Sequence, residues 1–257
     1  PTLSVAFVYL GQSGWRYATV EQSKQVYRDM FAAYLDERVI EQFVERPELF
    51  KEIGGISMEI TAFFSDIEGF TTISETLTPE ALSKMLEDYL TPMTDIIQGR
   101  GGLRDKYIGD AIVAMFGAPI HQPDHAIQGC LASLEQKDRL AALKKDPRLL
   151  GDPKSWLSVL NSKGRDFNAR MGVNTGLAKV GNFGSSKSKN YTMIGDTVNL
   201  AARLECANKA FGTYLMISEF TYAQAREYIE ARPLDSIRVK GKLRPVTVYE
   251  LMAKKGQ

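Results

Sequence analysis

The sequence predicts an α+β domain with a ferredoxin-like core, preceded by an N-terminal helical arm. Two observations support this prediction: apolar segments of the length of a strand recur along the chain, and segments with the apolar spacing of amphipathic helices separate them. The core begins with a strand at 57–65, which is followed by helices at 72–76 and 79–98. A hairpin with strands at 103–108 and 111–116 comes next, and then a helix at about 122–144 and a strand at 168–174. This is the β-α-β-β-α-β order of a ferredoxin-like fold, which hosts many different activities.

The first 54 residues are expected to form an arm in front of a domain that spans 55–257. Residues 1–10 are mostly apolar, which suits either a short buried strand or the end of a membrane helix. No stretch of the chain reaches the roughly 18 apolar residues that a membrane span needs. Apolar residues at helical spacing predict a helix over 20–46 that ends at Pro47. This helix either packs on its own domain or dimerises and transmits a signal.

Beyond the core, the polar stretch 145–165 is expected to be irregular, with Trp156 packing a loop. Further strands are predicted near 178–183, 213–217, 234–239 and 246–251, with helices at 196–209 and after Ser218. Two pairs of polar side chains are expected to have no role in a site. His121 and His125 flank the start of a helix, and Lys187 and Lys189 lie at the tip of a hairpin.

Composition excludes several classes of function. The 257 residues carry a formal net charge of +1, so no overall field points to nucleic acid as a partner. Only two cysteines occur, Cys130 and Cys206, which excludes a disulfide framework and favours a reduced, cytoplasmic setting.

An acidic residue, Asp66, stands where the apolar strand 57–65 ends, and a turn containing Gly69 and a helix start follow it. This arrangement can hold Mg²⁺ on the carboxylate while backbone N–H groups of Gly69, Phe70 and Thr71 face a phosphate. Taken alone, Asp66 could equally cap the helix.

A second acidic residue, Asp110, lies at the turn of the hairpin 103–116. In a ferredoxin-like sheet this hairpin neighbours the first strand, so Asp66 and Asp110 are expected to converge on one edge. Two carboxylates at neighbouring strand ends are typical of a two-metal site for phosphoryl transfer. Spacing and pattern therefore predict a two-carboxylate metal site that acts on a nucleotide.

Three motifs carry a more specific resemblance. They are Phe-Ser-Asp-Ile-Glu-Gly-Phe-Thr at 64–71, Lys-Tyr-Ile-Gly-Asp-Ala at 106–111, and Ile-Gly-Asp-Thr-Val-Asn-Leu-Ala-Ala-Arg at 194–203. Together, and in this order, they resemble the signature of class III adenylyl and guanylyl cyclase catalytic domains. The resemblance covers roughly 56–252.

The resemblance implies a role for each matching residue. Asp66, Asp110 and the backbone carbonyl of Ile67 would bind two Mg²⁺ ions, for which Mn²⁺ can substitute. Lys106 and Thr192 would recognise the purine. Asn199 would orient the ribose, and Arg203 would stabilise charge on the α-phosphate. Lys240 would hold the terminal phosphates.

The Lys106–Thr192 pair bears on the substrate. Lys106 can donate to adenine N1 and Thr192 can accept from the exocyclic amine, which favours ATP over GTP. The pair resembles a subgroup that includes bicarbonate-responsive adenylyl cyclases. Two alternatives stay open: a guanylyl cyclase, because a hydroxyl can donate as well as accept, and an inactive nucleotide-binding regulator that dimerises.

The resemblance also implies a homodimer with composite active sites, because in this family the metal-binding aspartates of one chain face the purine and transition-state residues of the other. The segment 34–43 resembles the helix that couples such domains to a membrane-bound sensor. The expected setting is therefore cytoplasmic, either as a free protein or as the cytoplasmic domain of an inner-membrane receptor.

Overall fold

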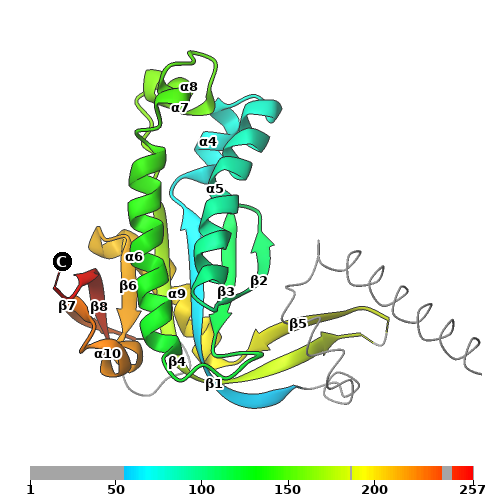
Figure 1. Ribbon diagram of the computed structural model, residues 1–257, viewed down its shortest axis with the longest axis vertical. Coiled ribbons are helices and arrows are strands. Elements are labelled where there is room, and N and C mark those ends of the chain that lie inside the picture. Colours follow the sequence, from blue (N-terminus) through cyan, green and yellow to red (C-terminus); the bar gives the residue numbers. More distant parts are fainter. Residues whose placement is uncertain (1–54, 186, 239–244, 257) are drawn as a thin grey trace, which may run out of the picture. The chain divides into compact units, whose positions relative to one another are not determined.

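The computed structural model describes residues 55–185, 187–238 and 245–256, and these form one α+β domain (Figure 1). Its strands are β1 (Ile56–Ile67), β2 (Leu103–Ile108), β3 (Ala111–Phe116), β4 (Ala169–Gly184), β5 (Lys189–Ile194), β6 (Leu215–Ser218), β7 (Ile229–Ile237) and β8 (Val246–Lys254). Its helices are α4 (Phe70–Thr76), α5 (Pro79–Gly99), α6 (His125–Leu143), α7 (Pro147–Leu150), α8 (Trp156–Ser162), α9 (Asp196–Phe211) and α10 (Glu219–Ala225). The arm predicted at 1–54, with its apolar segment and helix, lies outside the described residues, as does Lys240.

The predicted ferredoxin-like core is confirmed. The described strands form one sheet in the order β2-β3-β1-β4-β6-β8-β7, with β5 paired to the outer part of β4. Strand β1 runs antiparallel to both β3 and β4, so it lies in the middle of the core. Its residues Ile60, Ala62 and Phe63 are fully buried on both faces of the sheet because helices cover each face.

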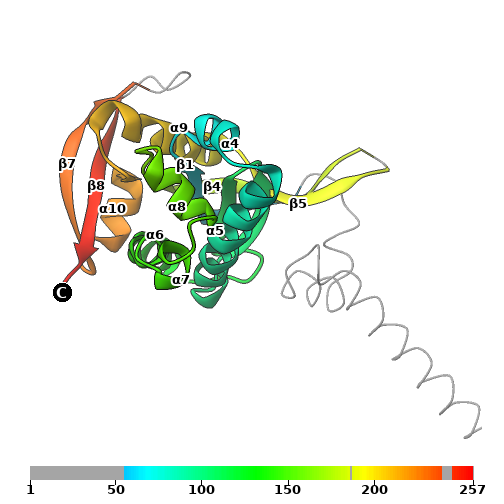
Figure 2. The same cartoon turned by 90° about the horizontal axis from the view of Figure 1, so that it is seen from above.

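Helices α5 and α6 lie on one face of the sheet and α9 lies on the other (Figure 2). On the first face, Gly129 of α6 comes close to Thr61 and Val173. On the opposite face, Gly172 of β4 lies directly against the backbone of α9. Close packing on this opposite face therefore positions α9, which carries most of the third sequence motif.

Strand β4 corrects one prediction. The strands expected at 168–174 and 178–183 are a single strand of 16 residues. Gly176, which lies between the two predicted strands, is paired with Ile60 of β1. A Cβ at this glycine would lie 2.9 Å from the Thr197 hydroxyl of α9. Glycine here therefore allows α9 to approach the sheet and does not mark a turn.

The stretch predicted to be irregular at 145–165 contains two short helices, α7 and α8. Trp156 begins α8 and is 1% exposed. Its ring lies 4.9 Å from that of Phe167, and its Nε1–H donates to Asp88 Oδ2 at 3.0 Å. Contacts with Asp88 of α5 and with Phe167, which precedes β4, thus order a segment whose local sequence favours turns.

No helix in the described ranges is long and apolar enough to cross a bilayer.

Candidate functional site

The structure brings Asp66 and Asp110 together. Ser65 of β1 pairs with Ile112 of β3, so the end of β1 and the β2–β3 turn lie at the same edge of the sheet. The backbone N–H of Ile67 donates to Asp110 Oδ2 at 3.0 Å. The predicted convergence of the two carboxylates is therefore observed.

The environment of Asp110 is unfavourable for a lone negative charge. The residue is 7% exposed, and burial, followed by the nearby Asp66, raises the pKa of its carboxyl to about 7. A divalent cation between the two carboxylates would offset both effects. The carboxylates and backbone carbonyls of this edge are oxygen donors, which suit Mg²⁺ or Mn²⁺. The residues present thus fit the metal that the motifs imply.

The turn after Asp66 has the conformation that the motif requires. Gly69 has φ 70°, in the left-handed region, and precedes the first turn of α4. A Cβ there would meet no atom within 4 Å, so the backbone conformation, and not space, calls for glycine. Phe70 and Thr71 begin α4 directly after it, close in sequence to Asp66.

Lys106 and Thr192 also lie together, although 86 positions separate them. Lys106 Nζ donates to Thr192 Oγ1 at 3.2 Å. The contact arises because β5 pairs with the outer part of β4 and so reaches β2. One chain therefore supplies both of the predicted purine-recognition residues as an assembled pair.

A third residue, Asp105, joins this pair and was missed by the sequence analysis. Its Oδ2 accepts the hydroxyl proton of Thr192, and its Oδ1 lies 3.3 Å from Lys106 Nζ. The Asp105 side chain is 2% exposed, and burial raises its pKa. The pairing of β2 with β3 shifts register between Arg104 and Lys106. This local irregularity, which has no clear sequence signal, occurs at Asp105.

Asn199 and Arg203 lie one turn apart on α9, and both are exposed. Leu200, Ala201 and Leu204, between and beside them, are fully buried. The buried face of α9 therefore holds the helix on the sheet, while Asn199 and Arg203 remain accessible to a ligand.

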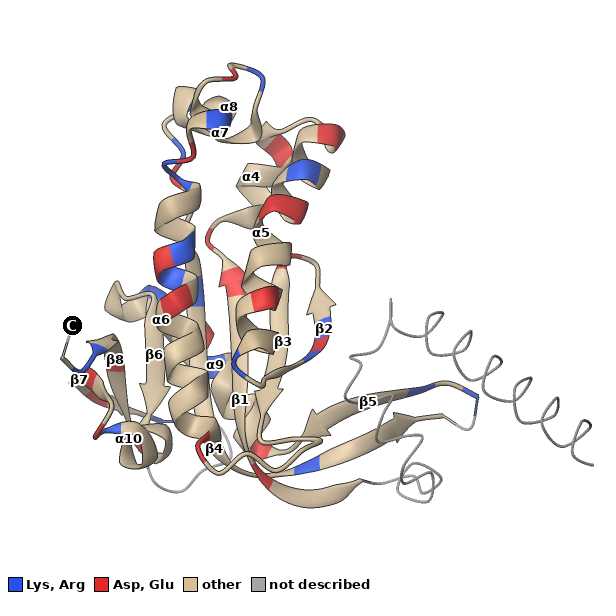
Figure 3. Ribbon diagram, in the orientation of Figure 1, with Lys and Arg blue, Asp and Glu red and all other residues tan. Residues whose placement is uncertain are grey.

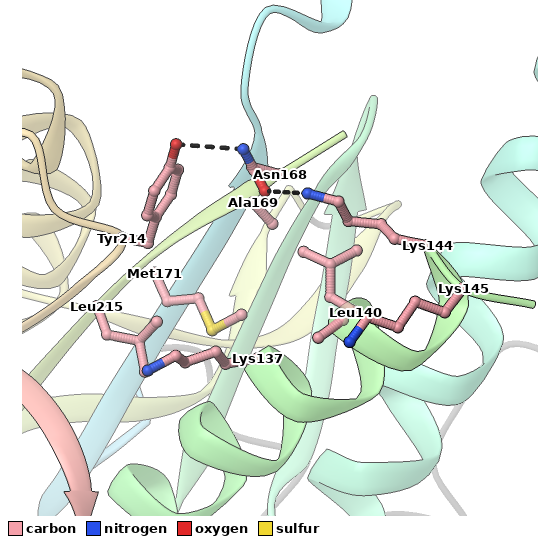
Figure 4. A pocket seen from close by; sticks show the side chains of 10 residues that line it. Lys137, Leu140, Lys144, Lys145, Asn168, Ala169, Met171, Tyr214 and Leu215 are labelled. Atoms are coloured by element: carbon pink, nitrogen blue, oxygen red, sulfur yellow. Dashed lines mark hydrogen bonds between the residues drawn. The ribbon is translucent and has the colours of Figure 1, made fainter. Parts of the chain in front are cut away.

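A cavity lies elsewhere in the described residues, between α6 and the N-terminal ends of strands β4 and β6 (Figure 4). It has a volume of about 320 Å³, and none of the predicted site residues lines it. Lys144, on its rim, donates to Asn168 Oδ1 at 3.0 Å and pairs with Asp166 at 2.6 Å. Its charge is therefore already compensated within the chain.

Charges of both signs occur on six of the described elements. Basic and acidic side chains occur together on α5, β2, α6, α9, β7 and β8 (Figure 3). Charges of both signs on these elements agree with the small net charge of the sequence.

Known proteins resemble this chain over most of its length. Adenylate cyclase 1 of Rhizobium meliloti (strain 1021) is 33% identical over 222 residues, which are 86% of this chain and 31% of that protein. The crystal structure of the adenylyl cyclase CyaB from P. aeruginosa matches with a TM-score of 0.68 and 34% identity, covering 79% of this chain and 98% of that one. The guanylyl cyclase Cya2 matches with a TM-score of 0.66 and 30% identity, covering 79% and 96%.

The match spans about a third of the length of the adenylate cyclases of Rhizobium meliloti and Anabaena cylindrica. The family model for the adenylate and guanylate cyclase catalytic domain matches residues 56–253, which include all three motifs and both assembled pairs. The chain therefore belongs to the family of adenylate and guanylate cyclase catalytic domains.

Proposed function

We propose that this domain converts ATP into 3′,5′-cyclic AMP and pyrophosphate. The observation that carries the choice of ATP is the contact between Lys106 and Thr192. An ammonium group suits the acceptor N1 of adenine, and a hydroxyl oxygen suits its exocyclic amine. Guanine presents N1–H to the ammonium group, donor against donor, which leaves a desolvated group unpaired.

In the proposed reaction the ribose 3′-oxygen attacks the α-phosphorus. The O3′–Pα bond forms, the bond from Pα to the bridging oxygen of the β-phosphate breaks, and the 3′-hydroxyl proton is released. Asp66, Asp110 and the Ile67 carbonyl would hold two Mg²⁺ ions, which when bound lower the pKa of the hydroxyl and neutralise the phosphates. Mn²⁺ has the same donor preference and can take this place.

The other residues act on the triphosphate and ribose. Arg203 would stabilise charge on the α-phosphate through its several N–H donors, and Asn199 would orient the ribose. Backbone N–H groups at Gly69, Phe70 and Thr71 would face the phosphates, and Lys240 would hold the terminal ones.

We propose that two copies of the chain form two composite sites, each with the aspartates of one copy and the purine, ribose and α-phosphate residues of the other. In support, the chain carries every residue of the motif set, so neither copy needs a different partner. Mixing Asp66→Ala with Arg203→Ala should restore part of the activity that each variant lacks. Heterodimers that form without restoring activity would contradict the shared site.

The substrate is tested by comparing ATP and GTP turnover in Mg²⁺ and in Mn²⁺. A higher kcat/KM for ATP is expected. The second candidate, a guanylyl cyclase, is favoured by the likeness to Cya2, and a higher kcat/KM for GTP would establish it. No turnover of either nucleotide by a properly folded dimer would indicate the regulatory alternative.

Three further expectations belong to this proposal. The domain boundary lies near 55, and the arm at 1–54 couples the domain to an upstream sensor, in support of which the chain spans only part of its longer relatives. The setting is cytoplasmic, as a free protein or on the inner side of a membrane receptor. Bicarbonate stimulates activity, as in the subgroup that shares the Lys–Thr pair; equal rates with and without bicarbonate at matched pH would contradict this.

A further inference from the structure

We propose that Asp105 is a positioning residue that turns Thr192 into an obligate hydrogen-bond acceptor and so sets the preference for adenine over guanine. This inference rests on the proposed function, because it concerns how the same pair of residues reads the purine. Neither the motifs nor the pattern of the sequence pointed to Asp105.

The hydrogen bonds around Thr192 determine what its hydroxyl can do. A threonine hydroxyl has one proton and two acceptor positions. Asp105 Oδ2 accepts the proton, and Lys106 Nζ donates to the oxygen at 3.2 Å. One acceptor position is left for a ligand. Thr192 can therefore accept a hydrogen bond from a base but cannot donate one while Asp105 holds its proton.

The two purines differ at the group that this position would meet. Adenine carries an exocyclic amine, which donates, and guanine carries a carbonyl oxygen at the same place, which only accepts. A free hydroxyl would rotate to serve either base. With its proton engaged, the Thr192 oxygen would face the guanine carbonyl oxygen as acceptor against acceptor, and a desolvated polar atom would be left unpaired.

The burial of Asp105 is costly for stability alone. The side chain is 2% exposed, and Oδ1 has no hydrogen bond, although Lys106 Nζ lies within ion-pair distance at 3.3 Å. Burial raises the pKa of Asp105, whereas the Thr192 hydroxyl and Lys106 lower it. Apolar side chains often replace such buried ion pairs without loss of stability. The role that an apolar side chain could not take over is to accept the Thr192 proton, which needs an oxygen at this position.

The test measures kcat/KM for ATP and for GTP in four dimeric proteins: wild type, Asp105→Ala, Thr192→Val, and the double variant. We expect Asp105→Ala to lower the ATP-to-GTP ratio at least fivefold, because Thr192 becomes free to donate. When Asp105→Ala is introduced into Thr192→Val, the logarithm of the ATP-to-GTP ratio of kcat/KM should change by less than half of its change in the wild-type background. Asp105→Asn keeps an oxygen acceptor and should retain more than half of the selectivity. Asp95→Ala, an exposed acid on α5, is the control and should leave the ratio unchanged.

Dissociation constants for 3′-deoxy-ATP and 3′-deoxy-GTP, which cannot cyclise, give a second readout and should shift in the same direction. If Asp105→Ala does not fold, Asp105→Leu fills the buried space and takes its place. A ratio that falls less than fivefold, or equally in both Thr192 backgrounds, would overturn the role of Asp105 while ATP stays the substrate. A wild type that prefers GTP would instead overturn the proposed function itself.

Discussion

Gly172 of β4 lies against α9, and replacing it with alanine perturbs the helix that carries Asn199 and Arg203. A Cβ at this position would lie 2.2 Å from the backbone nitrogen of Glu205 and 2.3 Å from the carbonyl oxygen of Ala201. Real Cβ contacts are essentially never under 3.0 Å, so the atoms must separate by about 0.8 Å. Because both neighbours are backbone atoms of α9, the helix and the strand must move apart.

The size of the effect follows from this displacement. Extra methyl groups in a packed interior typically cost about 1–3 kcal/mol of stability. A misplacement of about 1 Å in reacting groups can cost roughly 100-fold in rate. We therefore expect Gly172→Ala to lower the free energy of unfolding by about 1–3 kcal/mol and to lower kcat for ATP by roughly 10- to 100-fold.

The assay is the rate of cyclic AMP formation at saturating ATP and Mg²⁺, together with urea unfolding followed by circular dichroism. Gly99→Ala is the matched control, because a Cβ at that helical position meets no atom within 4 Å. This control should keep kcat and gain slightly in stability. A folded Gly172→Ala dimer with kcat within twofold of wild type would refute the idea that close packing of α9 on β4 positions Asn199 and Arg203 for the reaction.

Three further predictions concern charge and packing. Asp110 has a folded-state pKa raised to about 7, so the stability of the metal-free domain should fall as pH rises from about 4 to about 7. Asp110→Asn should then raise the free energy of unfolding at pH 8 by about 1–4 kcal/mol, and Mg²⁺ should raise the Tm of wild type only. Arg170 donates a hydrogen bond to Glu205 at 3.2 Å, and burial raises the pKa of Glu205, so Arg170→Met leaves this buried acid without its partner. The variant should lose more stability at pH 8 than at pH 5, and equal losses at the two pH values would contradict this. Trp156→Ala should cost about 3–5 kcal/mol in urea unfolding, with kcat of the folded dimer unchanged because α8 carries no site residue.

Much of the candidate site was predictable because its residues stand at the ends of regular elements. Asp66 follows an apolar strand and Asp110 occupies a hairpin turn, so the predicted sheet order alone brought them to one edge, as observed. The ferredoxin-like order was equally predictable, because the spacing of apolar residues distinguishes the strands from the helices of the core. These features depend on short-range pattern.

Other features depend on contacts between distant parts of the chain. Trp156 was expected in a loop, because the residues around it favour turns, yet packing on Phe167 and a hydrogen bond to Asp88 order it as the start of α8. Two strands were predicted at 168–174 and 178–183, yet pairing with β1 continues β4 through Gly176 without a break. In both cases tertiary contacts outweigh a weak local preference.

The sequence by itself determined the family and the order of the core elements, and it predicted the residues that would bind metal, phosphate and purine. Only the tertiary structure decided how the purine pair is built. Lys106 and Thr192 meet because β5 extends the sheet toward β2, and Asp105 joins them at a local shift in strand register. The direction of a hydroxyl proton depends on which acceptor the fold buries beside it, and no pattern along the chain records that choice.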